Sequence, residues 1–349
     1  MTTAVAAPFR FFALQVARTR RLGPSLVRVT FTGPELRDFR SDGRDQSLSL
    51  FLPQPGQSEP VVPLEQGWGS PRSSEAESGG GWWQGWRELP DDVRAVMRSY
   101  TLRELRTDAG GHTTEVDIDF VLHGITARGG ASAEAGPASR WAARAAAGDR
   151  VLLLGPAIAD NRAIRFRPPE DTDLVLLWAD ETALPAAAAV LETLPAGTRA
   201  RVWLEVPHSG DVQDLTTGAD AEITWHVREG AAAGPARSAP GPGEPAPVSP
   251  VAATARMGTG SPMGTGSPMG AGSYSPMGAG SYSPMALDAL RAAELPPAER
   301  PYVWIAGEAG CVRQLRRHFV GERGIDRRRV TFVGYWRHGL TEEQLCEQS

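Results

Sequence analysis

The sequence predicts a two-domain protein in which an antiparallel β-barrel is followed by an α/β domain built on a parallel sheet. Three observations lead to this fold class. Short apolar or alternating segments, separated by turns that contain Gly and Pro, fill residues 8–168, a spacing typical of a barrel. Fully apolar segments alternate with helical ones over residues 170–349, as in a sheet covered on both faces. A length of 349 residues also suits two hydrophobic cores better than one.

Six short strands are expected in the first half, and one insertion interrupts them. The strands are predicted over residues 9–16, 26–32, 48–52, 99–105, 115–122 and 150–154. Residues 54–86 are rich in Gly, Ser, Pro and Trp, which predicts a loop insertion. Its aromatic residues Trp82, Trp83 and Trp86 offer a binding platform, but rings that cap the barrel are the simpler interpretation.

The second half alternates strands with helices. Strands are expected over residues 174–179, 201–206, 302–306 and 330–333, and helices over 184–194 and 311–321. Such parallel sheets bind ligands at the carboxyl ends of their strands. A low-complexity tract of Gly, Ser, Pro and Met, residues 230–284, interrupts the pattern. It buries too little apolar surface to offset the entropy of ordering, so we expect a disordered linker without a metal site.

Composition argues against several classes of function. The net charge of −5 gives no general attraction to nucleic acid. Neither cysteine belongs to a Cys-x-x-Cys or Cys/His pattern, which argues against a disulfide framework, an iron–sulfur cluster or a zinc site. Without a signal peptide or an apolar run near the ~20 residues of a membrane span, we expect a cytoplasmic protein with no stable membrane insertion. All 36 cationic side chains are arginine, so anions are recognised by guanidinium groups, backbone amides and helix N-termini.

The motif Arg-Ser-Tyr-Thr-Leu-Arg, which begins at Arg98, is the first segment that suggests chemistry. On a strand, Arg98 and Tyr100 point to one side, while Ser99, Thr101 and Arg103 point to the other. An arginine fork suits a pyrophosphate, a tyrosine ring stacks on a flavin, and a threonine hydroxyl reaches a flavin heteroatom. An amphipathic strand with a surface salt bridge explains the same pattern, so the context decides.

Two segments further along the chain favour the flavin interpretation. A predicted strand that begins at Asp119 ends in the polar pair His123 and Gly124. The turn Gly-Pro-Ala-Ser then opens a helix at Gly136, and Ser139 lies at its cap or in its first turn. Such a helix start presents free N–H groups and a positive dipole end to a phosphate.

With these segments in place, the sequence resembles the siderophore-interacting protein family, the ViuB-like branch of the ferredoxin reductase superfamily. The resemblance implies a six-stranded FAD-binding barrel followed by a nicotinamide-binding α/β domain. It also implies an oxidoreductase that transfers electrons from NADH or NADPH through FAD to ferric siderophores and releases Fe(II) for iron assimilation. The matching segments are Arg98-x-Tyr-Thr-x-Arg103, Asp119-Phe-Val-Leu-His123, Gly136-Pro-Ala-Ser-x-Trp-Ala142, Asp180-Glu-Thr-Ala-Leu-Pro-Ala186, Ala306-Gly-Glu-Ala309 and Gly334-Tyr-Trp-Arg337.

Residue by residue, these segments supply the candidate cofactor-binding residues. From the barrel they are Arg98, Ser99, Tyr100, Thr101, Arg103, Asp119, Val121, His123, Gly136, Pro137, Ala138, Ser139 and Trp141. From the second domain they are Asp180, Thr182, Ala183, Gly307, Glu308 and Trp336, and Glu205 is added because it stands at the end of a predicted strand. No catalytic side chain and no metal ligand is expected, because the flavin carries the chemistry.

Several of these residues also have a purely structural interpretation. Asp180 and Thr182 are suited to capping the helix that follows them, a role that is compatible with cofactor contact. Trp336 either covers the flavin or lies in the core. His123 is interpreted as a flavin-contacting or structural residue rather than a base.

The sequence departs from the family pattern at two places. Ser49 stands where the family usually has a lysine that attracts anionic siderophores, so Arg44, Arg103 and Arg337 are candidates to compensate for it. An insertion over residues 125–135 lengthens the loop near the expected pyrophosphate site.

Alternatives remain open for the donor and the acceptor. A reductase of the same architecture that uses ferredoxin, a quinone or free flavin fits the same motifs, as does a siderophore-binding carrier with little turnover. Glu205 at a strand end favours a free ribose 2′-hydroxyl and hence NADH, whereas His208 or Arg228 would meet the 2′-phosphate of NADPH. We expect a monomer.

Overall fold

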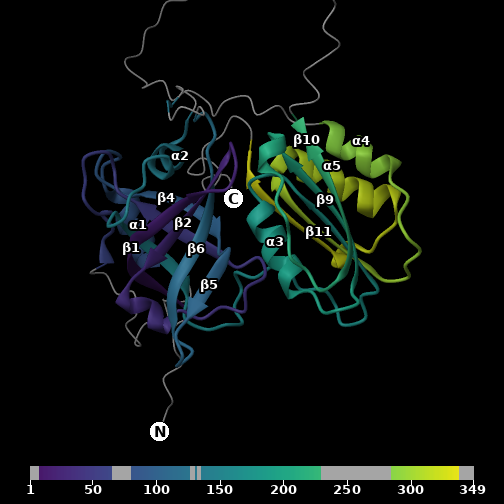
Figure 1. The fold of residues 1–349 in the computed structure, drawn as a ribbon, viewed down its shortest axis with the longest axis horizontal. Coiled ribbons are helices and arrows are strands. Elements are labelled where there is room, and N and C mark those ends of the chain that lie inside the picture. The colour runs from purple at the N-terminus through teal and green to yellow at the C-terminus, as the bar shows by residue number, and fades with distance from the viewer. Residues whose placement is uncertain (1–7, 65–79, 126–129, 132–134, 229–283, 338–349) are drawn as a thin grey trace, which may run out of the picture.

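The computed structural model describes residues 8–64, 80–125, 130–131, 135–228 and 284–337. These residues form a curled antiparallel sheet and a parallel sheet domain that lie side by side (Figure 1). The predicted fold class is confirmed. The low-complexity tract falls almost entirely outside the described residues, as does most of the insertion over residues 125–135. No helix in the described part of the chain is long and apolar enough to span a membrane.

The antiparallel sheet has seven strands in the order β4-β3-β7-β1-β2-β6-β5. The sheet is strongly curled, so its two edge strands, β4 and β5, lie close enough for a connection of two residues, Leu102 and Arg103. The Leu102 N–H donates to the Gln46 carbonyl and the Arg103 N–H to the Asp117 carbonyl, each at 2.9 Å, so the chain crosses from one edge to the other here. The strands are β1 (Phe9–Arg21), β2 (Leu26–Thr32), β3 (Ser47–Leu52), β4 (Val96–Thr101), β5 (Glu104–Thr107), β6 (Thr113–Val121) and β7 (Arg150–Pro156).

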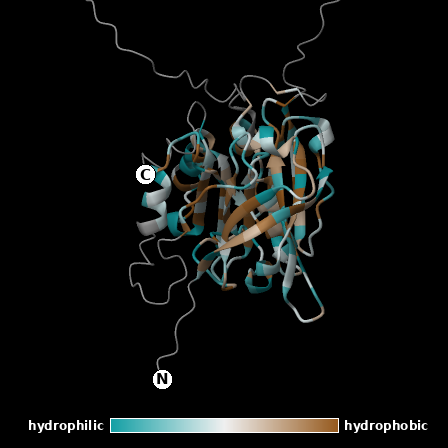
Figure 2. Ribbon diagram, turned by 90° about the vertical axis from the view of Figure 1, so that its left-hand side faces the viewer, coloured by the Kyte–Doolittle hydropathy of each residue, from teal (hydrophilic) through white to brown (hydrophobic). Residues whose placement is uncertain are grey.

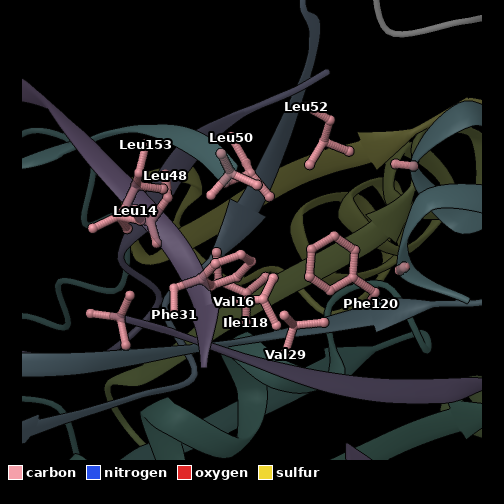
Figure 3. Close-up of a cluster of buried hydrophobic side chains, with 14 of the residues drawn as sticks. Leu14, Val16, Val29, Phe31, Leu48, Leu50, Leu52, Ile118, Phe120 and Leu153 are labelled. Atoms are coloured by element: carbon pink, nitrogen blue, oxygen red, sulfur yellow. The ribbon is translucent and has the colours of Figure 1, made fainter. Parts of the chain in front are cut away.

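This crossing explains a difference from the sequence prediction. The single strand expected over residues 99–105 is two strands, β4 and β5, because consecutive N–H groups bond to opposite edges of the sheet. Inside the curl, alternate residues such as Val29 and Phe31 of β2 and Ile118 and Phe120 of β6 form the core (Figure 3).

Helix α1 (Gly80–Glu88) covers the outer face of the sheet. Trp82 and Trp86 are 7% and 3% exposed, and the Trp82 ring lies 5.3 Å from Phe11 and 5.7 Å from Phe51. The tryptophans of the insertion therefore cap the barrel, as the simpler interpretation had it. The last part of residues 54–86 is helical rather than loop because these rings require a common face on which to pack.

The second domain is a five-stranded parallel sheet in the order β10-β9-β8-β11-β12. Helix α3 covers the face toward the barrel, and α4 and α5 cover the other face (Figure 1). The two central strands, β8 and β11, are continuous apolar segments. Figure 2, which views the molecule from the barrel side, shows brown hydrophobic stretches along the strands. In chain order the elements are β8 (Leu174–Ala179), α3 (Leu184–Thr193), β9 (Arg199–Val206), β10 (Asp220–Val227), α4 (Pro284–Ala292), β11 (Pro301–Glu308), α5 (Ala309–Arg317) and β12 (Val330–Trp336).

The two domains share buried contacts. Leu26 and Val121 of the barrel pack into the apolar cluster beneath α3. Asp45, only 3% exposed, lies just before β3 and accepts a hydrogen bond from the Trp304 indole of β11 at 3.0 Å. Its other oxygen accepts the N–H groups of Arg165 and Phe166, at 3.0 and 2.9 Å. One carboxylate thus joins the barrel, the connecting segment and the parallel sheet.

The substitution Asp45→Ala tests this junction. It leaves three donors without an acceptor, two of them buried, and each buried loss costs about 1–3 kcal/mol, so we expect the free energy of unfolding to fall by about 3–5 kcal/mol. Urea denaturation measures the change. The control is Asp38→Ala, which removes an exposed ion pair with Arg10 and is expected to cost less than about 1 kcal/mol. Equal effects of the two substitutions would contradict the role of Asp45.

Candidate cofactor-binding site

The parallel sheet has a topological switch point between β8 and β11. The chain leaves β8 toward β9 and β10 on one side and returns to β11 and β12 on the other. Ligands of such sheets bind outside the carboxyl ends of the strands at this point. The barrel lies against this edge, because His123, just after β6, has its ring 6.1 Å from that of Trp336 at the end of β12. A ligand at the switch point therefore faces both domains.

The Asp180 carboxylate ties three strand ends together at the switch point. It follows β8 and is 3% exposed. One of its oxygens accepts the backbone N–H of Glu308, at the end of β11, at 2.8 Å and the indole N–H of Trp336, at the end of β12, at 2.9 Å. The other accepts the N–H and hydroxyl of Thr182, at 2.9 and 2.5 Å, and the N–H of Ala183 at 3.3 Å. The predicted capping of α3 by Asp180 or Thr182 is wrong: Ala183 is the N-cap of this helix and no side chain bonds its first N–H groups, so Asp180 instead holds the turn that precedes the helix.

The backbone beside Asp180 requires glycine. Gly307 has a φ of 148°, and a Cβ atom built on it would lie 2.5 Å from an Asp180 carboxylate oxygen. Glu308 then begins helix α5 and accepts the N–H of Cys311 at 2.8 Å. The predicted residues Thr182, Ala183, Gly307 and Glu308 therefore meet around one buried carboxylate.

Burial governs the charge of this group. Desolvation, and secondly the neighbouring Glu181 carboxylate, raise the pKa of Asp180 to about 7. The nearby His123 shifts in the opposite direction: burial lowers the pKa of its imidazole, although the negative charge of Glu181 opposes this. Near neutral pH the switch point thus holds a carboxyl group that readily takes up a proton.

A second buried group of charges lies along the same edge. Arg228, which follows β10, donates to Glu205 of β9 at 3.1 Å and to Glu181 after β8 at 2.5 Å. Burial lowers the pKa of Arg228, but its bonds to the two carboxylates outweigh this and raise it. Glu205, predicted to hold a ribose hydroxyl, is already paired with a guanidinium.

On the barrel side, β4 brings most of the flavin motif to the domain boundary. The Tyr100 ring lies 4.4 Å from that of Phe120, and the Thr101 hydroxyl lies 3.4 Å from the hydroxyl of Tyr335 on β12. The Arg98 guanidinium donates to the carbonyl of Met97 at 2.6 Å. Thr101 thereby links the flavin motif to the carboxyl edge of the parallel sheet.

Helix α2 (Pro137–Ala142) lies against β4 and β6. Its N-cap, Gly136, has no side chain to bond the first N–H groups, and no acidic residue lies in the first turn. The Ser139 hydroxyl donates to the Val121 carbonyl at 2.9 Å, which fixes the helix on β6. Arg98, the amides of α2 and the Tyr100 ring supply the cation, the N–H donors and the aromatic surface that FAD requires. The residues present therefore fit a flavin dinucleotide.

Three predicted residues are not brought to this edge. Arg103 forms a bidentate ion pair with Glu192, at 2.7 and 3.0 Å, about 12 Å along α3 from its start. Asp119 forms a bidentate pair with Arg28, at 2.7 and 2.9 Å. Trp141 is 5% exposed and stacks on Phe31 in the barrel core, with ring centroids 6.3 Å apart. Each of these side chains is engaged in a contact within the protein.

The two candidate substrate residues, Arg44 and Arg337, belong to different domains. Arg44 has a φ of 58° before β3 and lies 3.4 Å from Asp42. Arg337 follows Trp336 directly, so it lies at the carboxyl edge of the sheet. Ser49 of β3 pairs with Ser99 of β4.

Sequence reasoning missed two residues of the edge. Glu181 is one of them. It lies two residues after the buried strand β8, and ligands bind near the carboxyl ends of such strands, so its position in the sequence could have indicated it. Tyr335 alternates with Val333 along β12 and so faces the barrel with it. Its hydroxyl is buried, which raises its pKa.

Comparisons with known proteins agree with this geometry. Residues 15–160 match the siderophore-interacting FAD-binding domain, and residues 172–240 and 277–339 match the siderophore-interacting protein model. The siderophore-interacting protein SipS from Aeromonas hydrophila has a similar structure, with a TM-score of 0.61, 28% identity and coverage of 97% of this chain and 96% of that one. Ferric vibriobactin reductase ViuB of Vibrio cholerae is 25% identical over 96% of this chain and 92% of its own. An NADPH-dependent ferric-chelate reductase of Escherichia coli is 26% identical over 94% and 93%.

The raised pKa of Asp180 predicts a pH dependence of stability. The pKa of Asp180 is about 7 in the folded protein, which is above its value of about 4 in the unfolded chain. The contribution of this group to stability is therefore complete below pH ~4 and is lost as the pH rises through about 7. In Asp180→Asn the side chain stays neutral, so the fall in unfolding free energy between these pH values should become smaller. Urea denaturation at several pH values measures it. Asp220→Asn, at an exposed position, is the control. An unchanged slope in Asp180→Asn would show that Asp180 does not titrate in this range.

Proposed function

Because the chain belongs to the siderophore-interacting protein family, we propose that it is an oxidoreductase that passes electrons from NADH or NADPH through FAD to ferric siderophores. Its relatives include proteins named as ferric reductases, which supports a flavin oxidoreductase. The proposed product is Fe(II), which siderophore oxygen ligands hold less firmly than Fe(III) because they are hard donors. Iron is the cargo of this reaction and not a resident cofactor.

One observation carries the proposal. The Thr101 hydroxyl of the flavin motif lies 3.4 Å from the Tyr335 hydroxyl, at the edge where a parallel sheet binds its ligand. A flavin held by β4 would therefore be adjacent to a nicotinamide held at the switch point. This proximity would allow direct hydride transfer from the nicotinamide to the flavin, because reacting groups must be held close together.

The side chains in this proposal bind and orient, and they do not react. Arg98 and the first amides of α2 would hold the pyrophosphate, and Tyr100 would pack against the flavin ring. Bound FAD would supply hydride acceptance and single-electron delivery. Asp180 would hold the Trp336 indole in place beside His123, so the site keeps its shape and excludes water.

The remaining expectations become part of the proposal. Arg44 and Arg337 would attract an anionic ferric siderophore where Ser49 carries no charge. The proposal also places the reaction in the cytoplasm and assigns it to a monomer.

Flavin binding is tested first. The purified protein should show the visible absorption bands of an oxidised flavin, and Arg98→Ala and Tyr100→Ala should each lower FAD occupancy by about tenfold or more. The matched control is Arg18→Ala, which removes an arginine paired with Glu115 on the outer face of the barrel. Full occupancy in both motif variants would refute their role.

Electron transfer is tested by anaerobic stopped-flow absorbance. Addition of NADH or NADPH should bleach the flavin bands, and a ferric siderophore should then restore them. If neither coenzyme bleaches the flavin, the nicotinamide step is wrong and a donor such as ferredoxin becomes the better hypothesis. If the reduced flavin is not reoxidised by ferric siderophore, the acceptor is wrong and a quinone, or a carrier function, is favoured instead.

A further inference from the structure

The buried charges at the carboxyl edge of β8, β9 and β10 bear on which nicotinamide coenzyme binds. In a parallel sheet of this order, an acidic residue at the end of the second strand meets the adenosine ribose of the dinucleotide. Glu205 occupies that position, one residue before the end of β9. The side chain at this position discriminates between NADH, which has a free 2′-hydroxyl, and NADPH, which has a 2′-phosphate.

The arginine that would recognise a 2′-phosphate is already occupied. Arg228 bridges the carboxylates of Glu205 and Glu181, and its side chain is 20% exposed. Both carboxylate side chains are nearly inaccessible, at 4% and 3%. Two carboxylates and one guanidinium leave the cluster with a formal charge of −1. A phosphate brought to this edge would meet negative charge that the arginine does not neutralise.

The same cluster carries an acceptor that lacks a donor. The second carboxylate oxygen of Glu181 is buried and has no hydrogen-bond partner among the described residues. A buried, unpaired carboxylate oxygen is costly. A hydroxyl group can donate a hydrogen bond to this oxygen, whereas a negatively charged phosphate oxygen cannot donate one and is repelled by it. The Glu181 charge also acts on His123 of the barrel, so this carboxylate lies where the two domains meet.

The histidine that lies beside Glu205 on the neighbouring strand adds no positive charge. His226 pairs in register with Glu205 across β10 and β9, and burial lowers the pKa of its imidazole. It is therefore neutral near pH 7 and does not attract an anion.

We infer that the Glu181–Arg228–Glu205 cluster accepts a ribose hydroxyl and rejects a 2′-phosphate, so that the electron donor is NADH rather than NADPH. This inference rests on the proposed function, since it concerns the same nicotinamide site. Glu181, Glu205 and Arg228 act as specificity-determining residues.

Direct binding tests the inference without requiring turnover. The FAD-loaded protein is titrated calorimetrically with ADP-ribose and with its 2′-phosphorylated form. We expect ADP-ribose to bind at least about tenfold more tightly. The difference should shrink when the ionic strength rises from about 20 mM to about 500 mM, because salt screens the repulsion of the phosphate. Equal binding, or tighter binding of the phosphorylated form, would overturn the inference with no variant needed.

Two substitutions should then shift the preference in steps. Glu205→Gln brings the formal charge of the cluster to zero, and Glu181→Gln combined with it brings the charge to +1 and frees Arg228. The ratio of kcat/KM for NADH to that for NADPH should fall by about tenfold or more at each step. The control is Glu222→Gln, which neutralises a carboxylate on β10 that is paired with Arg201 and lies six residues, and so about 20 Å, along the strand before Arg228. A ratio that changes as much in the control as in the cluster variants would count against the assignment.

Failure of the proposed function has a different signature. In that case neither coenzyme bleaches the flavin and neither fragment binds. If both coenzymes bleach the flavin and NADPH is used as well as NADH, the proposed function stands and only the selectivity is wrong.

Discussion

The Asp180 carboxylate is the contact on which the candidate site depends. It bonds the residue after β8 to the ends of β11 and β12 and to the start of α3. These segments are far apart in the chain, and without a shared acceptor their N–H groups would be buried and unpaired. Gly307 leaves the space that this carboxylate needs. The position of the Trp336 indole next to the barrel follows from the same bond.

A relay between two cofactors also requires that the two domains keep a fixed distance. Buried groups provide this rigidity: Asp45 bonds to the Trp304 indole, and Leu26 packs beneath α3. At the far end of α3, Arg103 and Glu192 add an ion pair between the domains. This role suits an arginine fork, because it holds the carboxylate in a defined geometry. In the proposed function, residues 98–103 thus contribute both to cofactor binding and to the domain junction.

Charge is distributed unevenly over the two halves of the proposed relay. The barrel presents Arg98 and the free amides of α2, which suit a pyrophosphate. The parallel sheet presents an edge on which acids outnumber bases, with Glu181 and Glu205 against Arg228. Burial makes these charges count more than they would at the surface. The nicotinamide side therefore favours hydroxyl groups over additional phosphate.

The sequence by itself determined the fold class, the order of the two domains, the strand character of the flavin motif and the helix α2, although not the division of residues 99–105 into β4 and β5. These features depend on local periodicity and turn residues, which neighbouring positions encode. Only the tertiary structure decided the partners of individual side chains. Arg103 pairs with Glu192, Glu205 with Arg228, and Trp141 with Phe31, contacts between positions far apart in the sequence. A side chain at a correctly predicted position still binds whichever distant group the fold brings to it, and no local pattern contains that choice.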